Sequence, residues 1–287
     1  AALADLFGLS GKLALVTGAN AGEHVGPLAE ALAQWIGKAI ALKLAVAGAT
    51  VIVNGRSDKA TAAAVDQINE AAAASGGSAI AAVADLSTVE GNAALVSAVE
   101  ATGQPLDVLV CNVGVYRTID YADTTDEDWE DYFKTNIMST VRPCRSFLPG
   151  MIERDAGGRV IIVSSEAAFK PVPEMVAYSV TKAAQVNLAR GLAEQTKGTS
   201  VTVNTLLPGP TATEGVASYF EGLAKKDGKP AAEVIKAYFA SREPASLKQG
   251  LLDPNEVANT ALFLASKASS ATNGASVRAE GGLYRSI

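Results

Sequence analysis

The sequence predicts an α/β fold, a single doubly wound Rossmann-type domain in which helices flank a seven-stranded parallel sheet. Seven apolar runs rich in β-branched residues recur along the 287 residues, and each ends at or directly before a Gly, Asn or Ser. These runs are continuous rather than alternating, which is typical of strands covered on both faces. Ala- and Leu-rich helical stretches separate them, and right-handed crossovers then build a doubly wound sheet.

The expected elements follow one another with no solenoid repeat or low-complexity linker between them. The predicted strands are Leu13–Ala19, Val51–Arg56, Ala79–Leu86, Val108–Gly114, Val160–Ser165, Val201–Gly209 and Ser276–Gly282. The main predicted helices are Ala60–Ala74, Glu127–Leu148, Tyr178–Gln195 and Pro254–Ala265. One long stretch without a strand, about 212–250, is either a helical excursion over a site or an ordinary surface insertion. We expect residues 1–287 to form one domain.

Composition excludes several classes of protein. The hydrophobic content of 48% allows a large core, and the net charge of −6 gives no basic footprint for nucleic acid. No apolar run reaches the length of a membrane span, and Ala1–Ser10 lacks the pattern of a signal peptide. The two cysteines, Cys111 and Cys144, fall in a predicted strand and a predicted helix, so we expect reduced thiols and a cytoplasmic protein.

Two turns suggest a dinucleotide. Thr17–Gly22 follows the first strand directly, where glycines let the backbone approach a pyrophosphate and the next helix offers free N–H groups. The second strand ends in Asn54-Gly55-Arg56-Ser57, with no carboxylate for the ribose hydroxyls of NAD. Arg56 is suited to a 2′-phosphate, so NADP(H) is favoured and NAD(H) is the alternative.

A tyrosine and a lysine open the helix after the fifth strand. Tyr178 and Lys182 are four residues apart and project from one helical face. A phenol titrates at about 10, and a neighbouring ammonium, together with a positively charged oxidised nicotinamide, is expected to stabilise the phenolate and lower that pKa. Ser165 ends the fifth strand and reaches the same carboxyl edge of the sheet. Asn136 either fixes a water for a proton relay or satisfies a local backbone kink.

Together these motifs resemble the short-chain dehydrogenase/reductase family over nearly the whole chain. The resemblance implies a catalytic tetrad of Asn136, Ser165, Tyr178 and Lys182. It implies that Asp85 and Leu86 border the adenine, that Asn112 and Gly114 line the cofactor cleft, and that helices form dimers or tetramers. The expected cofactor-binding residues are Thr17, Gly18, Asn20, Gly22, Ile36, Gly37, Arg56, Asp85, Leu86, Asn112, Gly114, Tyr178, Lys182, Pro208, Gly209 and Thr213. Cys111 and Val113 depart from the usual fourth-strand motif.

The phosphate loop departs more strongly. In the family it runs straight from its second glycine into Ile-Gly, whereas here Glu23–Trp35 separates Gly22 from Ile36-Gly37. The insertion has its own helical pattern and contains the only histidine, His24, to which we assign no role; no metal site is predicted. Three alternatives are open for this insertion: it loops outwards, it folds over the cofactor as a lid, or it displaces Gly37 from the phosphates. The sequence does not decide between them.

The leading hypothesis is an NADPH-dependent ketone or aldehyde reductase, with Tyr178 donating the proton and Ser165 holding the substrate oxygen. The alternative is a binding or scaffold protein of the same fold that holds cofactor poorly because of the insertion. An epimerase or dehydratase is less favoured, because the chain lacks a large C-terminal substrate region. The residues expected near the substrate are mostly apolar, which suits a neutral, medium-sized molecule. They are Val115, Tyr116, Ala167, Phe169, Val172 and Ala212–Phe239.

Overall fold

The computed structural model describes residues 3–20 and 35–285 and contains one seven-stranded sheet. All neighbouring strands are parallel, in the order β3-β2-β1-β4-β5-β6-β7, which confirms the predicted Rossmann-type sheet. The strands are β1 (Leu13–Val16), β2 (Thr50–Gly55), β3 (Ser78–Val83), β4 (Leu106–Cys111), β5 (Arg159–Val163), β6 (Thr202–Pro208) and β7 (Ser276–Ala279). The order reverses between β1 and β4, where such sheets bind their ligands.

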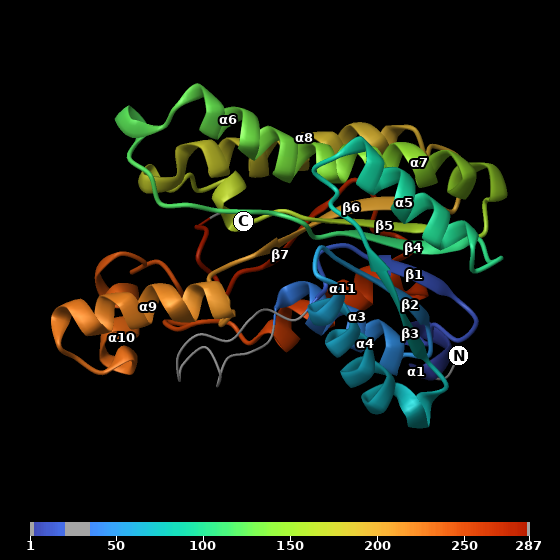
Figure 1. The fold of residues 1–287 in the computed structure, drawn as a ribbon, viewed down its shortest axis with the longest axis horizontal. Coiled ribbons are helices and arrows are strands. Elements are labelled where there is room, and N and C mark those ends of the chain that lie inside the picture. Colours follow the sequence, from blue (N-terminus) through green and yellow to red (C-terminus); the bar gives the residue numbers. More distant parts are fainter. Residues whose placement is uncertain (1–2, 21–34, 286–287) are drawn as a thin grey trace.

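Helices cover both faces of the sheet (Figure 1). One layer contains α5 (Val89–Glu100), α6 (Asp126–Tyr132), α7 (Met138–Arg154) and α8 (Val176–Glu194). The opposite layer contains α3 (Ile36–Val46), α4 (Asp58–Ala72) and α11 (Pro254–Ala265), with the short α1 (Leu3–Phe7) beside it. Short turns of helix complete the described elements: η1 (Ala73–Ser75), η2 (Tyr121–Asp123), η3 (Phe133–Ile137), η4 (Glu166–Ala168), η5 (Pro173–Met175) and η6 (Lys267–Ser269).

The two layers explain why the strands are continuously apolar. In β1, Ala14 and Val16 pack into the core shared with α3, α4 and α11. Leu13 and Leu15 point to the other face and pack into the core under α5, α7 and α8. Because successive strand residues face opposite sides, all four are fully buried only when both faces are covered.

One predicted helix is interrupted. The stretch Glu127–Leu148 was expected to be continuous, but α6 ends at Tyr132 and α7 starts at Met138. Between them lies a π-helical turn, η3, which contains Asn136. The Asn136 amide makes two hydrogen bonds to the backbone of Val115, so the widened turn directs this side chain towards the end of β4.

The long stretch without a strand forms a helical excursion. It contains α9 (Glu214–Asp227) and α10 (Ala231–Ser241), which project beyond the sheet (Figure 1). Phe220 and Phe239 are buried, and edge-to-face ring contacts link them through Tyr238. A parallel bridge between Thr211 and Leu252 closes the base of the excursion.

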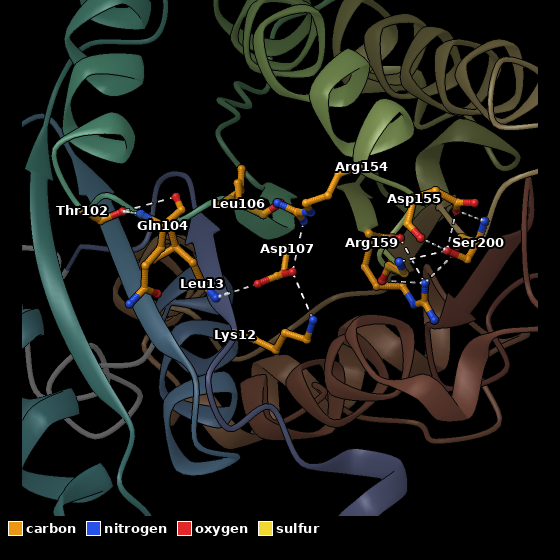
Figure 2. Close-up of polar contacts among 12 residues, drawn as sticks. Lys12, Leu13, Thr102, Gln104, Leu106, Asp107, Arg154, Asp155, Arg159 and Ser200 are labelled. Carbon is orange, nitrogen blue, oxygen red and sulfur yellow. Dashed lines mark hydrogen bonds and ion pairs between the residues drawn. The ribbon is translucent and has the colours of Figure 1, made fainter.

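A polar network connects the chain segments at the edge of the sheet where the amino ends of the strands lie (Figure 2). Asp107, at the start of β4, accepts hydrogen bonds from the Leu13 amide, the Lys12 ammonium and the Arg154 guanidinium, each at 3.1 Å. Arg159, which is 4% exposed, donates to backbone carbonyls only, including that of Ser266. The two buried charges, Asp107 and Arg159, are both hydrogen-bonded, so this network stabilises the fold at this edge.

The first turn of α3 packs tightly against the turn after β1. A Cβ on Gly37 would lie 2.4 Å from the Asn112 Nδ2 and 2.5 Å from the Gly18 carbonyl oxygen. Gly18 itself has φ 61°, which favours glycine. Gly37 therefore lies against Gly18 despite the insertion between them, and the alternative that displaces Gly37 from this turn is not supported. Residues 21–34, with Gly22, His24 and most of the insertion, lie outside the described residues.

We expect Gly37→Ala to destabilise the protein by about 1–3 kcal/mol, because the added methyl meets backbone and amide atoms that have little room to move. Urea unfolding followed by circular dichroism measures the change. Gly191→Ala is the matched control, since the exposed Gly191 lies within α8 and its Cβ would meet nothing within 4 Å. That variant should be neutral or slightly more stable. Equal effects of the two substitutions would contradict the packing described here.

Candidate active site

Four side chains predicted from the sequence converge at the carboxyl edge of the sheet. Ser165 follows β5, Asn136 lies in the π-helical turn, and Tyr178 and Lys182 come from the first half of α8. Gly114 follows β4 and lies beside two of them, because its Cβ would lie 3.4 Å from the Lys182 Nζ and 3.6 Å from the Asn136 Oδ1. The structure thus brings together residues that are up to 46 positions apart in the chain, counted from Asn136 to Lys182 (182 − 136 = 46).

Ser165 is fixed by local hydrogen bonds. It is the N-cap of η4, and its Oγ accepts a hydrogen bond from the Ala167 amide at 3.1 Å. The same hydroxyl donates to the Glu166 carboxylate at 2.6 Å. Ser165 is 6% exposed, so its rotation is limited by these two partners.

Tyr178 is partly buried and lies beside a second phenol. Its ring meets that of Tyr116 edge to face, with 6.2 Å between the centroids. Burial raises the pKa of Tyr178, and the negative charge of Glu166 raises it further, while the Ser165 hydroxyl opposes these effects. In the protein chain alone the net shift of the Tyr178 pKa is thus upward, and the expectation that Lys182 lowers it together with an oxidised nicotinamide stays a prediction. A buried phenol beside a carboxylate favours the protonated form, which is a proton donor.

Lys182 is one helical turn away and almost completely buried. Its ammonium lies 5.6 Å from the centre of the Tyr178 ring. It donates hydrogen bonds to the Val163 carbonyl and to the Gln185 side-chain oxygen, each at 3.0 Å. Burial lowers the pKa of Lys182 to about 8, and the charge of Glu166 opposes this shift. Lys182 thus exchanges protons near neutral pH.

Asn136 connects β4 and α8. Its amide is fully buried and donates to both the Val115 carbonyl and the Thr181 hydroxyl at 3.0 Å. Its backbone carbonyl accepts from the Gln185 amide at 2.8 Å. The structure shows the backbone kink that was one of the two alternatives for this residue, and the water relay stays a prediction.

Gln185 was missed by the sequence analysis. It links the Lys182 ammonium to the Asn136 carbonyl through its two side-chain ends, and it is fully buried. The signal was an amide three residues after Lys182, on the same face of a helix that packs on the sheet. A buried amide at that spacing indicates a hydrogen-bonded network around the lysine.

The turn after β1 is held by the end of β4. The Asn112 side chain donates to the carbonyls of Thr17 and Gly18, and its backbone amide donates to the Thr17 hydroxyl. Asn112 thus shapes the predicted phosphate turn from behind. Asn20 also belongs to this turn and contacts the end of β2, where a Cβ on Gly55 would meet its side chain.

These residues fit a dinucleotide phosphate. The first turn of α3 starts at Ile36 with no side-chain cap, so its N–H groups are not used by a capping side chain. Gly18 and Gly37 leave no side chain between the helix and the turn. A cap supplied by a bound anion suits such a helix start.

Arg56 and Asp85 lie at the ends of β2 and β3. Arg56 is exposed, and no described residue forms an ion pair with it. Burial raises the pKa of Asp85, but the Ser87 amide and the charges of Arg56 and Lys134 outweigh this and lower it. The neighbouring Leu86 is buried. Both charged side chains are thus near the place predicted for the adenosine half.

The remaining predicted residues follow β6. Gly209 packs against the segment after β7, since its Cβ would lie 2.9 Å from the Glu280 Cα. Pro208 ends β6, and the buried Thr213 precedes α9 as an N-cap residue without a side-chain capping bond. They connect the sheet edge to the helical excursion.

Two further contacts were not predicted. The Trp35 indole donates to the Glu214 carboxylate at 3.0 Å and joins the start of α3 to the start of α9. The second contact is the hydrogen bond between Ser165 and Glu166. Glu166 also affects the pKa of both Tyr178 and Lys182. Neither stands in a spacing pattern that would have indicated its contact before the fold was known.

Lys182 provides a pH test. Its pKa is about 8 in the folded protein and about 10.5 unfolded, so the unfolded chain binds more protons between these values. The free energy of unfolding should therefore rise with pH from 8 to 10.5, relative to Lys182→Met, by about 1–3 kcal/mol. Urea titrations at each pH measure this difference. The exposed Lys197→Met should show no such slope, and a pH-independent difference for Lys182→Met would contradict the burial effect.

The chain was compared with known proteins. A family model for short chain dehydrogenases matches residues 12–224. The uncharacterized oxidoreductase YvrD of Bacillus subtilis (strain 168) is 45% identical over 279 residues, which cover 97% of this chain and 98% of that protein. Gluconate 5-dehydrogenase of Gluconobacter oxydans (strain 621H) is 31% identical over 283 residues, or 99% of this chain and 98% of the relative.

The chain is also similar to solved structures of dehydrogenases and reductases. L-Sorbose reductase from Gluconobacter frateurii, complexed with NADPH and L-sorbose, has a TM-score of 0.87 at 27% identity and covers 98% of this chain and 99% of its own. A 3-oxoacyl (acyl-carrier-protein) reductase from Agrobacterium tumefaciens C58, with NADP bound, has a TM-score of 0.81 at 33% identity, covering 98% and 97%. In the described residues, no helix is long and apolar enough to cross a membrane. The chain belongs to the short-chain dehydrogenase/reductase family and is an oxidoreductase acting on CH–OH or C=O groups.

Proposed function

We propose that this protein is an NADPH-dependent ketone or aldehyde reductase, reversible as an alcohol dehydrogenase. The observation that carries the proposal is the cluster of Ser165, Tyr178 and Lys182 at the carboxyl edge of the sheet, beside the glycine turn. A bound nicotinamide supplies or accepts the hydride at its C4 atom. The residues of the chain manage the substrate oxygen and its proton.

Each residue of the cluster has a distinct task. Tyr178, whose raised pKa keeps the phenol protonated before the reaction, donates its phenolic proton to the substrate oxygen during reduction. Ser165 donates a hydrogen bond to the same oxygen and stabilises the charge that develops there. Lys182, held by Val163 and Gln185, stabilises the resulting phenolate and holds the nicotinamide ribose. Asn136 positions Val115 and α8 around them.

The cofactor preference rests on Arg56. It is exposed at the end of β2, and the turn Asn54-Gly55-Arg56-Ser57 contains no carboxylate to bind ribose hydroxyls. The L-sorbose reductase and 3-oxoacyl reductase structures, which contain NADPH and NADP, support this preference. The alternative of a non-catalytic scaffold is not favoured, because Gly37 remains against Gly18.

The substrate is a neutral, medium-sized carbonyl compound in this proposal. Tyr116 and Phe169 contribute aromatic surface near the cluster, and the relatives include enzymes named for a sugar acid, a ketose and an acyl thioester. A cytoplasmic location, a single-domain chain and assembly into dimers or tetramers remain predictions of the sequence analysis.

Tyr178→Phe should lower kcat by at least about 100-fold, because the proton donor is lost. The circular dichroism spectrum and the dissociation constant for NADPH, measured by fluorescence titration, should stay close to those of the wild type. Tyr121→Phe removes an exposed phenol and is the control. Undiminished turnover by Tyr178→Phe would refute the assignment.

Arg56→Ala should raise the KM for NADPH about 10- to 100-fold, since a charge-assisted bond to the 2′-phosphate is lost. The KM for NADH should change little, because NADH lacks that phosphate. Lys59→Ala removes a nearby exposed charge at the start of α4 and controls for general electrostatics. A parallel rise of both KM values in Arg56→Ala would argue against NADP recognition by Arg56.

A further inference from the structure

The Ser165 hydroxyl can donate one hydrogen bond, and in this structure the Glu166 carboxylate accepts that hydrogen bond. The Ser165 Oγ donates to the Glu166 Oε2 at 2.6 Å while accepting from the Ala167 amide. A hydroxyl can donate only one hydrogen bond. Ser165 therefore cannot donate to a substrate oxygen until its hydrogen bond to Glu166 is broken.

Glu166 also lines a cavity. The cavity has a volume of about 220 Å³ and lies between η4 and the last two strands. Its apolar wall comes from Phe169, Leu207 and Tyr284, and Arg278 and Glu280 supply further polar groups. Glu166 thus links this cavity to the catalytic cluster through its hydrogen bond with Ser165.

The charges around Glu166 already have partners. The Lys170 ammonium is bound to both oxygens of Glu243, at 2.6 and 2.5 Å. The Arg278 guanidinium donates to Glu280 at 2.6 Å and stacks on the Tyr284 ring. Within the described ranges, no ion pair includes Glu166. Its carboxylate is thus a hydrogen-bond acceptor on the cavity wall, and among the described residues Ser165 is its side-chain donor.

We propose that Glu166 is a specificity-determining residue that selects α-hydroxy carbonyl substrates, and vicinal diols in the reverse direction. The substrate hydroxyl next to the reacting carbon donates to Glu166 in place of Ser165. The Ser165 hydroxyl then rotates and donates a hydrogen bond to the reacting oxygen, next to Tyr178. This inference rests on the proposed reductase function, whose substrate class it specifies.

Geometry favours a neighbouring hydroxyl. Ser165 Oγ and Glu166 Oε2 are one hydrogen-bond length apart. The two oxygens of an α-hydroxy ketone have a similar separation, so one substrate edge can address both groups. A simple ketone offers only an acceptor and leaves Ser165 bound to Glu166.

The test compares two ketones that differ by one hydroxyl. Steady-state kinetics with NADPH are measured for 3-hydroxy-2-butanone and 2-butanone, in the wild type, Glu166→Gln and Glu166→Ala. We expect the wild type to prefer the hydroxy ketone in kcat/KM by at least about 10-fold, the contribution of a hydrogen bond to a charged group. In both variants this ratio should fall towards one.

The direction of each change separates specificity from structural support. For the hydroxy ketone, kcat/KM should drop in the variants, whereas for 2-butanone it should stay equal or rise, since Ser165 is no longer held by a carboxylate. A merely structural role of Glu166 would lower both values in parallel and would overturn the proposal. Glu194→Gln is the control. It removes an exposed carboxylate of α8 that pairs with Arg190, and the kcat/KM values for both ketones should stay unchanged.

A binding experiment keeps the inference testable if the proposed function fails. Saturation-transfer NMR compares 2,3-butanediol with 2-butanol on wild type and Glu166→Gln. Stronger binding of the diol that disappears in Glu166→Gln supports the inference even if neither ketone is reduced. Equal binding of both alcohols to the wild type, or an unchanged diol preference in Glu166→Gln, overturns it.

Discussion

The whole site depends on one constraint, which is that parallel strands covered on both faces present their carboxyl ends at a single edge. Backbone groups inside such a sheet are satisfied by the neighbouring strands, so polar side chains collect where the strands stop. Thr17, Asn112 and Ser165 follow the ends of β1, β4 and β5, and α8 crosses the same edge with Tyr178 and Lys182. The distances in sequence between these residues are large, but the sheet reduces them to a few ångströms.

Burial then sets the chemistry of this edge. Tyr178 and Lys182 both lose hydration, which raises the pKa of the phenol and lowers that of the ammonium. The two shifts bring a protonated phenol next to an amine that titrates near neutral pH. Glu166 adds a negative charge that acts on both groups, so the proton balance depends on three side chains rather than two.

The insertion in the phosphate loop is compatible with this arrangement. Gly37 still packs on Gly18, and Asn112 holds the intervening turn from the β4 side. Trp35, the last residue of the insertion, is hydrogen-bonded to Glu214 at the start of α9. The start of the cofactor helix and the start of the helical excursion are therefore physically linked, and both border the same edge of the sheet (Figure 1).

The sequence by itself determined the fold class, a doubly wound parallel sheet, and indicated the glycine turn, because both depend on local pattern. It indicated the four residues of the cluster through the spacing of Tyr178 and Lys182 and through the family resemblance. Apolar continuity identified strands such as β5, and the four-residue spacing of Tyr178 and Lys182 placed both on one helical face. Only the tertiary structure decided the roles of Gln185 and Glu166, since their partners come from the π-helical turn and from the cavity beside β7. The break at Asn136 and the upward pKa shift of Tyr178 likewise arise from packing between elements, which no single stretch of sequence encodes.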